Sequence, residues 1–232
     1  YLPHSRLPAR FPAEWPGEWI AETTSPTQRA AHRSLYLHAG GAASFEPVGA
    51  SDRALPAATI RNLPSAGASG PLCFGGGAPP IGLADNLRED VRQLEAVAAA
   101  APAPERAAVW TSEVLTEELL ICGRPQLRLR ITPDGREGAI VARLGDVAPD
   151  GAISMVTQGM LNLAYRTEQS PLPLVPGATI EVTLDLRVIA HAFAPGHRLH
   201  LQLLGSAFPI TWPLVTPFAL TCSEDGDAML TL

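Results

Sequence analysis

The side chains best suited to nucleophilic chemistry in this sequence are the serines and histidines that stand near glycine. Ser69 lies in the segment Gly-Ala-Ser-Gly at 67–70. A serine hydrolase of the α/β class needs Gly-x-Ser-x-Gly, because that strained turn exposes the hydroxyl group beside its oxyanion donors. The tetrapeptide is one residue short, and residues 38–41, His-Ala-Gly-Gly, resemble an oxyanion motif that no nucleophile elbow follows. We therefore predict no catalytic residue in this chain.

Three histidines in the last part of the chain, His191, His197 and His200, are candidate metal ligands. His197 and His200 stand three residues apart in a predicted strand, so their side chains should point to opposite faces of the sheet. His191 and His197 flank a predicted turn at 193–196, where we expect them to hydrogen-bond to nearby backbone groups. The pattern predicts no metal site and no cofactor site.

Several aromatic side chains are better suited to contacts than to catalysis. Trp15 and Trp19 stand among prolines and charged residues, in a segment with neither a strand nor a helix period. Trp110 and Phe208 suit a core or a seam between domains, whereas Trp212 precedes a proline in a predicted loop. We predict that Trp15, Trp19, Phe208 and Trp212 form apolar contacts with a second domain.

The composition describes a globular chain without a nucleic-acid-binding face. The 232 residues are 46% hydrophobic and 17% charged, which suffices for a sizeable core. The net charge of −6 argues against nucleic-acid binding, because phosphate recognition needs a concentrated basic surface. No apolar run reaches the roughly 18 residues of a membrane span. We expect no membrane partner, a cytoplasmic location by default, and three buried cysteine thiols.

Alternating apolar residues predict strands in the second half of the chain. Leu127, Leu129 and Ile131 alternate with arginines, and the segment 180–186 shows the most regular alternation. The segments 140–144 and 199–203 likewise have one apolar face each, and turns with Pro and Gly separate the segments. We find roughly eight candidate strands, which predicts an all-β, antiparallel sandwich of jelly-roll type.

The N-terminal part of the chain has less regular patterns. Residues 1–30 are rich in Pro and Trp and predict an irregular strap, and residues 31–232 are predicted to form the sandwich domain. A loop and helix excursion is predicted near 46–104, and Ala, Gly, Ser and Pro dominate its first part, residues 46–80. Within it, residues 85–97 have leucines and a valine at spacings of four and three after an aspartate, which predicts one short amphipathic helix.

Four stretches combine strand patterns with distinctive turns. They are Trp110–Leu119 with Cys-Gly-Arg-Pro after it, Ala142–Gly151, Val156–Arg166, and Leu174–Gly177 together with Ala190–Leu199. In their order and spacing they resemble the C-terminal domain of the X-prolyl dipeptidyl-peptidase and cocaine-esterase-like (CocE/NonD) serine hydrolases, over about residues 105–221. Residues 208–213, Phe-Pro-Ile-Thr-Trp-Pro, depart from the commoner pattern of that family, in which an Arg- and Asn-containing loop follows Phe-Pro.

The resemblance implies a galactose-binding-like jelly roll that follows an α/β-hydrolase domain in a serine peptidase, esterase or acylase. The Ser, Asp and His triad of that family precedes the sandwich, so none of its members is carried over onto this chain. The resemblance further implies that residues 1–30 lead in from a catalytic domain of the same polypeptide. The sandwich would pack on that domain and help to shape its substrate cleft.

Two other functions stay open. The first is a free-standing module that binds a carbohydrate or another ligand, which needs exposed aromatics beside polar groups on one rim. The second is an independent enzyme, for which the chain offers no convergent nucleophile, base and orienting group. An α/β-hydrolase elbow in the upstream coding sequence would favour the accessory domain, and an immediate start codon would favour the binding module. A homo-oligomer is compatible with each function.

Overall fold

The computed structural model describes residues 2–3, 18–21, 23–24, 29–47, 57–67, 86–101, 105–167, 170–208, 210–223 and 228–232. Strands dominate this part of the chain: β1 (Leu2–Pro3), β2 (Ser34–Leu37), β3 (Ala42–Ser44), β4 (Ala58–Arg61), β5 (Arg106–Ala107), β6 (Val109–Ser112), β7 (Leu119–Gly123), β8 (Gln126–Pro133), β9 (Ala139–Val147), β10 (Ile153–Asn162), β11 (Ile180–Asp185), β12 (Ile189–Phe193), β13 (Arg198–Leu204), β14 (Ala219–Cys222) and β15 (Met229–Thr231). The described helices are α1 (Asn86–Ala99) and two short 3-10 turns, η1 (Ala39–Gly41) and η3 (Leu163–Tyr165).

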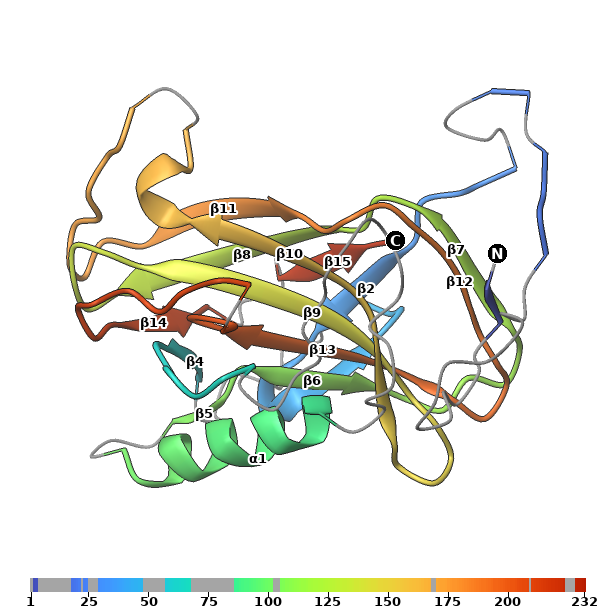
Figure 1. Ribbon diagram of the computed structural model, residues 1–232, viewed down its shortest axis with the longest axis horizontal. Helices are drawn as coiled ribbons and strands as arrows, with labels where there is room; N and C mark the ends of the chain where they lie inside the picture. The colour runs from blue at the N-terminus through green and yellow to red at the C-terminus, as the bar shows by residue number, and fades with distance from the viewer. Residues whose placement is uncertain are drawn as a thin grey trace.

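The strands form a large sheet and a small one. In the large sheet, hydrogen-bonded neighbours follow the order β10-β9-β13-β6-β3-β2-β15-β8-β14-β4-β5, and β11 pairs with β8. The small sheet has the order β1-β12-β7 and runs along the right-hand edge of Figure 1, beside the N-terminus. Most pairs are antiparallel, and β1–β12, β3–β6 and β4–β5 are parallel.

The large sheet folds over one apolar core. Leu144 of β9, Leu201 of β13 and Trp110 of β6 belong to the same buried cluster as Leu129 of β8 and Leu184 of β11. Each of these side chains is at most 4% exposed. The two halves of the sheet therefore pack face to face, and the predicted β-sandwich with one short helix is confirmed.

The alternation read from the sequence is clearest in β8 and β11. These strands pair antiparallel, with Leu129 opposite Val182 and Arg128 opposite Thr183. Leu129 and Val182 are buried, and the Nε of Arg128 lies 2.8 Å from Oε1 of the exposed Glu181. One face of this strand pair therefore enters the core while the other meets solvent, as the period of two predicts.

Strands β9 and β13 differ from the expectation of one apolar face each. Both are buried on their two faces, because α1 packs on the outer surface of this half of the sheet (Figure 1). Val141 and Leu204 form a second apolar cluster with Leu94 of α1. The expected helix at 85–97 is confirmed with bounds Asn86–Ala99, and its position explains the second buried face. No helix in the described part of the chain is long and apolar enough to cross a membrane.

Strand β10 spans Ile153–Asn162 without interruption, and its pairing with β9 shifts between Met155 and Thr157. The expectation that all three cysteines are buried was wrong. Cys222 is buried, but Cys122 of β7 is exposed, because alternate residues of this edge strand face away from the core. Cys73 lies outside the described residues.

Replacing Gly159 with alanine should destabilise the sandwich. Gly159 of β10 faces the C-terminal end of β11, and a methyl group there would overlap the carbonyl oxygen of Asp185. Since backbone has to move, we expect Gly159→Ala to lower the free energy of unfolding by about 1–3 kcal/mol, measured by urea denaturation. Gly135→Ala is the control, because a methyl group at Gly135 meets no atom of the described residues within 4 Å. Equal effects of the two substitutions would contradict the close approach of β10 and β11.

Candidate functional site

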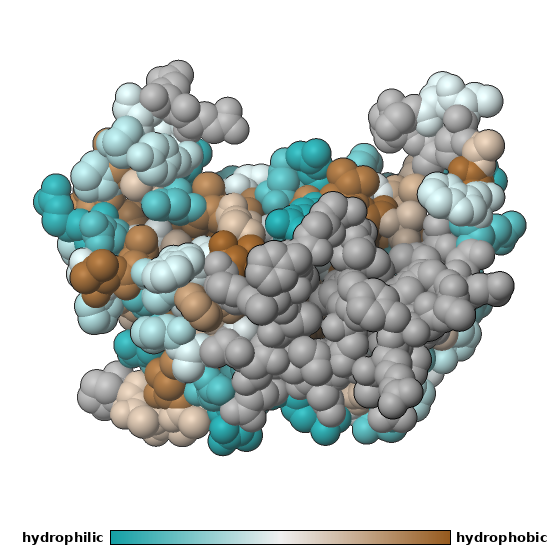
Figure 2. Space-filling model, in the orientation of Figure 1, coloured by the Kyte–Doolittle hydropathy of each residue, from teal (hydrophilic) through white to brown (hydrophobic). Residues whose placement is uncertain are grey.

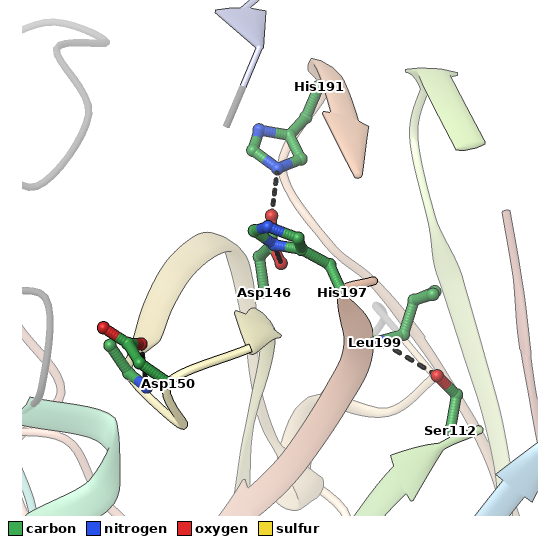
Figure 3. A network of polar contacts seen from close by, with 7 residues as sticks. Ser112, Asp146, Asp150, His191, His197 and Leu199 are labelled. Carbon is green, nitrogen blue, oxygen red and sulfur yellow. Dashed lines mark hydrogen bonds and ion pairs between the residues drawn. The ribbon is translucent and has the colours of Figure 1, made fainter. Parts of the chain in front are cut away.

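A buried carboxylate held between two imidazoles lies where the large and small sheets meet. Oδ1 of Asp146 is 2.8 Å from Nδ1 of His197, and Oδ2 is 3.2 Å from Nε2 of His191. Figure 3 shows Asp146 between the two rings, one from each side. The Asp146 side chain is 0% exposed, and those of His197 and His191 are 9% and 16% exposed. We call these three residues the His-Asp-His cluster.

Three strands position the cluster. Asp146 lies near the end of β9, opposite Leu199 of β13, and His197 immediately precedes β13 after the Pro-Gly turn. His191 lies in the middle of β12, opposite Ile121 of β7 and Leu2 of β1. The cluster therefore joins the small sheet, including its N-terminal strand, to the sandwich.

Burial determines what the carboxylate of Asp146 requires. A carboxylate only accepts hydrogen bonds, so each ring nitrogen that faces it donates an N–H. A buried carboxylate without donors is costly, whereas hydrogen bonds that involve a charged group contribute more than neutral ones. The His191 ring also packs edge-on against Phe193, with ring centroids 4.8 Å apart and planes at 81°. The arrangement fixes both rings and is suited to structural cohesion.

The cluster shows no catalytic arrangement with its neighbouring serine. The Ser112 hydroxyl donates to the carbonyl oxygen of Glu113 at 2.8 Å and accepts from the backbone N–H of Leu199 at 2.9 Å. Figure 3 shows the Ser112 hydroxyl directed toward Leu199, with which it forms its hydrogen bond. The hydroxyl therefore serves the backbone of β6 and β13. Ser69 lies outside the described residues.

His191 and His197 have a different partner from the one that we expected from the sequence. We expected both rings to bond to nearby backbone groups, but they share the carboxylate of Asp146. An aspartate at an inward-facing position of an apolar strand was the signal that this buried group needs donors. Among the described residues, no three His, Cys, Asp or Glu side chains are arranged to hold a metal ion.

The His-Ala-Gly-Gly segment forms a turn at the end of a strand. It lies between β2 and β3 as η1, and the His38 carbonyl oxygen accepts a hydrogen bond from the Nε1 of Trp110 at 3.1 Å. The His38 ring nitrogen Nε2 is 2.7 Å from the Ser44 hydroxyl. These contacts tie the turn to the core tryptophan.

His200 lies apart from the His-Asp-His cluster. As expected from the strand period, it faces the outer side of β13, where its Nδ1 is 3.0 Å from the hydroxyl of Thr111 on β6. The residue is 3% exposed, and burial lowers the pKa of His200 to about 4. The imidazole is therefore neutral near pH 7.

The aromatic residues that we predicted to contact a second domain do not all lie together in the structure. Phe208 and Trp212 form an edge-to-face pair, with ring centroids 5.3 Å apart and planes at 71°, and they are 37% and 72% exposed. Trp19 is fully exposed, in a segment at the upper right of Figure 1, whereas the loop between β13 and β14 lies at the left. Trp110 is a core residue, 1% exposed. Trp15 lies outside the described residues.

Backbone atoms fix the loop that presents the aromatic pair. We call residues 205–208 and 210–216 the aromatic loop. Its Ala207 and Thr211 exchange backbone hydrogen bonds of 2.9 and 2.8 Å, and the N–H of Phe208 donates to the carbonyl oxygen of Ala66 at 2.9 Å. The Ser206 hydroxyl donates to the carbonyl oxygen of Leu63 at 2.7 Å. The two rings are therefore held in place without being buried.

Comparison with known proteins identifies similar domains. A family model described as the X-Pro dipeptidyl-peptidase C-terminal non-catalytic domain matches residues 2–230. The chain is 32% identical over 101 residues to cocaine esterase from Rhodococcus sp. (strain MB1 Bresler), and 30% identical over 115 residues to a putative serine esterase from Mycobacterium bovis. These alignments cover 43% and 42% of this chain and 18% of each relative, so the chain spans about a fifth of the relatives' length.

Solved structures share the fold. An aminopeptidase from the marine sediment archaeon Thaumarchaeota archaeon aligns with a TM-score of 0.67 at 21% identity, over 92% of this chain and 38% of that protein. A CocE/NonD family hydrolase from Staphylococcus aureus aligns with a TM-score of 0.62 at 13% identity, over 93% of this chain and 39% of that protein. At these identities the comparison describes the fold.

Replacing Asp146 with asparagine should loosen the junction of the two sheets. Both imidazoles lose a carboxylate partner in a buried site, so we expect the free energy of unfolding to fall by about 2 kcal/mol or more in urea denaturation. Asp185→Asn is the matched control, because the Asp185 side chain is 47% exposed beside Arg124. That substitution should cost less than about 1 kcal/mol. A loss at Asp146 no larger than at Asp185 would show that the cluster contributes little.

The buried His200 should make stability depend on pH. The folded-state pKa of about 4 lies below the usual value, so the unfolded chain binds the proton first as the pH falls. This contribution is fully present above about pH 6.5 and is lost toward pH 4, by up to about 3 kcal/mol. Urea denaturation at a series of pH values should show a shallower decline for His200→Gln than for the wild-type chain. Parallel curves would contradict the assignment.

Proposed function

Because this chain belongs to the family of X-Pro dipeptidyl-peptidase C-terminal non-catalytic domains, we propose that it packs on an α/β-hydrolase catalytic domain of the same polypeptide and helps to shape that domain's substrate cleft. The hydrolase would cleave a peptide, ester or amide bond with its own serine nucleophile. The present chain would contribute binding surface and no reacting group.

The observation that carries this proposal is the exposed aromatic pair on the aromatic loop. Trp212 and Phe208 leave much of their surface in contact with solvent, although hydrogen bonds already order the loop beneath them. Ordering a loop before binding lowers the entropic cost of association, and large aromatics at the centre of an interface dominate binding energies. A pre-ordered pair of this kind is suited to a seam with another domain.

The described surface of the sandwich carries small apolar groups that could contact the catalytic domain. Figure 2 views the molecule from the same side as Figure 1. Hydrophobic residues (brown) form separate groups among hydrophilic ones (teal) on the described part of this face. Val215 of the aromatic loop is also fully exposed. Interfaces within a chain are often mixed in polarity, so a seam built on a few aromatic anchors fits this surface.

The N-terminal segment supports the same placement. Strand β1 pairs with β12, so the start of the chain is attached to the small sheet, next to the His-Asp-His cluster. We propose that residues 1–30 form a strap from the catalytic domain and that Trp15 and Trp19 contact it, while residues 31–232 form the accessory domain with an excursion near 46–104. The strap and the aromatic loop would then touch the catalytic domain at two separate places.

We further propose that the sandwich is a galactose-binding-like jelly roll. The support is that strands distant in the sequence are neighbours, as where β13 lies between β9 and β6. A free-standing carbohydrate-binding module is less well supported, because the rings of Phe208 and Trp212 stand at 71° and form no flat platform.

Replacing Trp212 with alanine tests the seam in the full-length gene product. We expect weaker substrate binding or weaker docking of the two domains by about 1–3 kcal/mol, because a large aromatic anchor is lost at an interface. Steady-state kinetics and limited proteolysis of the interdomain boundary would measure the two effects. The melting temperature of the present chain alone should barely change, because Trp212 is 72% exposed.

Trp110→Ala is the matched control, since the same side chain is removed from a position that is 1% exposed. That substitution should cost about 3–5 kcal/mol of stability in the isolated chain. If Trp212→Ala melts the isolated chain and leaves the kinetics of the full-length protein unchanged, Trp212 is structural and the seam is elsewhere. An upstream coding region without a hydrolase domain would instead reject the accessory function itself.

A further inference from the structure

The outer face of the α1-covered half-sheet carries an unusual row of polar side chains. Gln158 of β10 lies opposite Arg143 of β9, and Arg143 lies opposite Gln202 of β13. His200 is two residues from Gln202 on the same face of β13. Directly opposite residues on neighbouring strands bring their side chains together. We call these four residues the polar row.

The polar row is closed off from solvent. Arg143 is 6% exposed, Gln158 is 2%, His200 is 3% and Gln202 is 0%. Helix α1 contributes Asp90, whose Oδ2 is 2.6 Å from Nη1 of Arg143 in an ion pair with both side chains buried. This pair neutralises the charge of the guanidinium at the centre of the row.

Five polar atoms of the row have no hydrogen-bond partner among the residues that the structure describes: Arg143 Nε, Gln158 Oε1, His200 Nε2, and Oε1 and Nε2 of Gln202. Native proteins satisfy nearly all buried polar groups, with protein atoms or with ordered water. If these five polar atoms were left without partners, the cost in folding free energy would be comparable with the stability of a whole domain. These atoms, which lie on three adjacent strands, therefore require hydrogen-bond partners that the described side chains and backbone do not supply.

The chemistry of the five atoms restricts what that partner is. Arg143 Nε only donates, a glutamine Oε1 only accepts, and Gln202 presents one atom of each kind. An anion would leave the carbonyl oxygens without donors, and a cation would leave the N–H groups without acceptors. The ion pair with Asp90 and the neutral imidazole of His200 leave no net charge to attract an ion. The occupant must be neutral and must both donate and accept.

We propose that ordered water molecules bind along the polar row and bridge Gln158, Arg143, Gln202 and His200 beneath the cover of α1. Water is small, neutral and both donor and acceptor, and a buried water typically makes about three hydrogen bonds to otherwise unsatisfied groups. A few waters at this site are in keeping with the usual frequency of about one buried water per 27 residues. The site is independent of any partner domain.

A high-resolution crystal structure of this chain tests the proposal directly. Water oxygens should lie about 2.7–3.2 Å from Gln202 and from at least one other member of the row. In solution, cross-peaks between long-lived water and the backbone amides of residues 143 and 202 should give the same result. A Gln202 amide that bonds directly to Gln158 or His200, with no water between them, would overturn the proposal.

A substitution pair gives a second, independent readout. Gln202→Met keeps the length of the side chain and removes both polar atoms, so the waters lose a partner and the melting temperature should fall by about 2–6 °C. Gln126→Met is the control, because Gln126 is an exposed strand residue that donates to Asp185, and its melting temperature should move by less than about 1–2 °C. A rise in melting temperature for Gln202→Met would mean that the amide was unsatisfied in the wild-type chain, and it too would sink the proposal.

Discussion

Strand β9 carries Arg143 toward α1 and Asp146 toward the small sheet, and a buried charge is tolerated only where an opposite charge or suitable hydrogen-bond groups surround it. Each of the two residues is satisfied by a different part of the chain. Asp90 of α1 pairs with Arg143, whereas His191 and His197 donate to Asp146. Two polar residues of one strand therefore hold two other parts of the fold in place. Arg143 binds helix α1 through Asp90, and Asp146 binds the small sheet through His191.

Much of the sandwich could be predicted from the sequence because a period of two is visible wherever one face of a strand is exposed. Leu129 of β8 and Val182 of β11 were assigned correctly for this reason. The same rule misjudged the outer face of β9, where Arg143 is buried, since cover by a helix distant in the sequence leaves no local signal. Polar residues on that face looked like solvent contacts, although they face α1.

The candidate site was harder to predict than the fold. Both imidazoles of the His-Asp-His cluster were singled out, but their shared carboxylate is 45 residues or more away in sequence. The pairing of β9 with β13 brings Asp146 close to His197, and the position of β12 in the small sheet adds His191. Among the contact aromatics, the edge-to-face pair of Phe208 and Trp212 rests on backbone bonds to the turn near Ala66, which no local pattern foretells.

The way in which the aromatic loop is anchored has a consequence for divergence among related proteins. Its contacts with Leu63 and Ala66 are made to backbone carbonyl groups, and Gly67 allows the carbonyl of Phe208 to approach closely. The path of the loop therefore depends little on which side chains stand at positions 208 and 212. Substitutions at these positions would change the surface that the loop presents while leaving in place the backbone contacts that hold it.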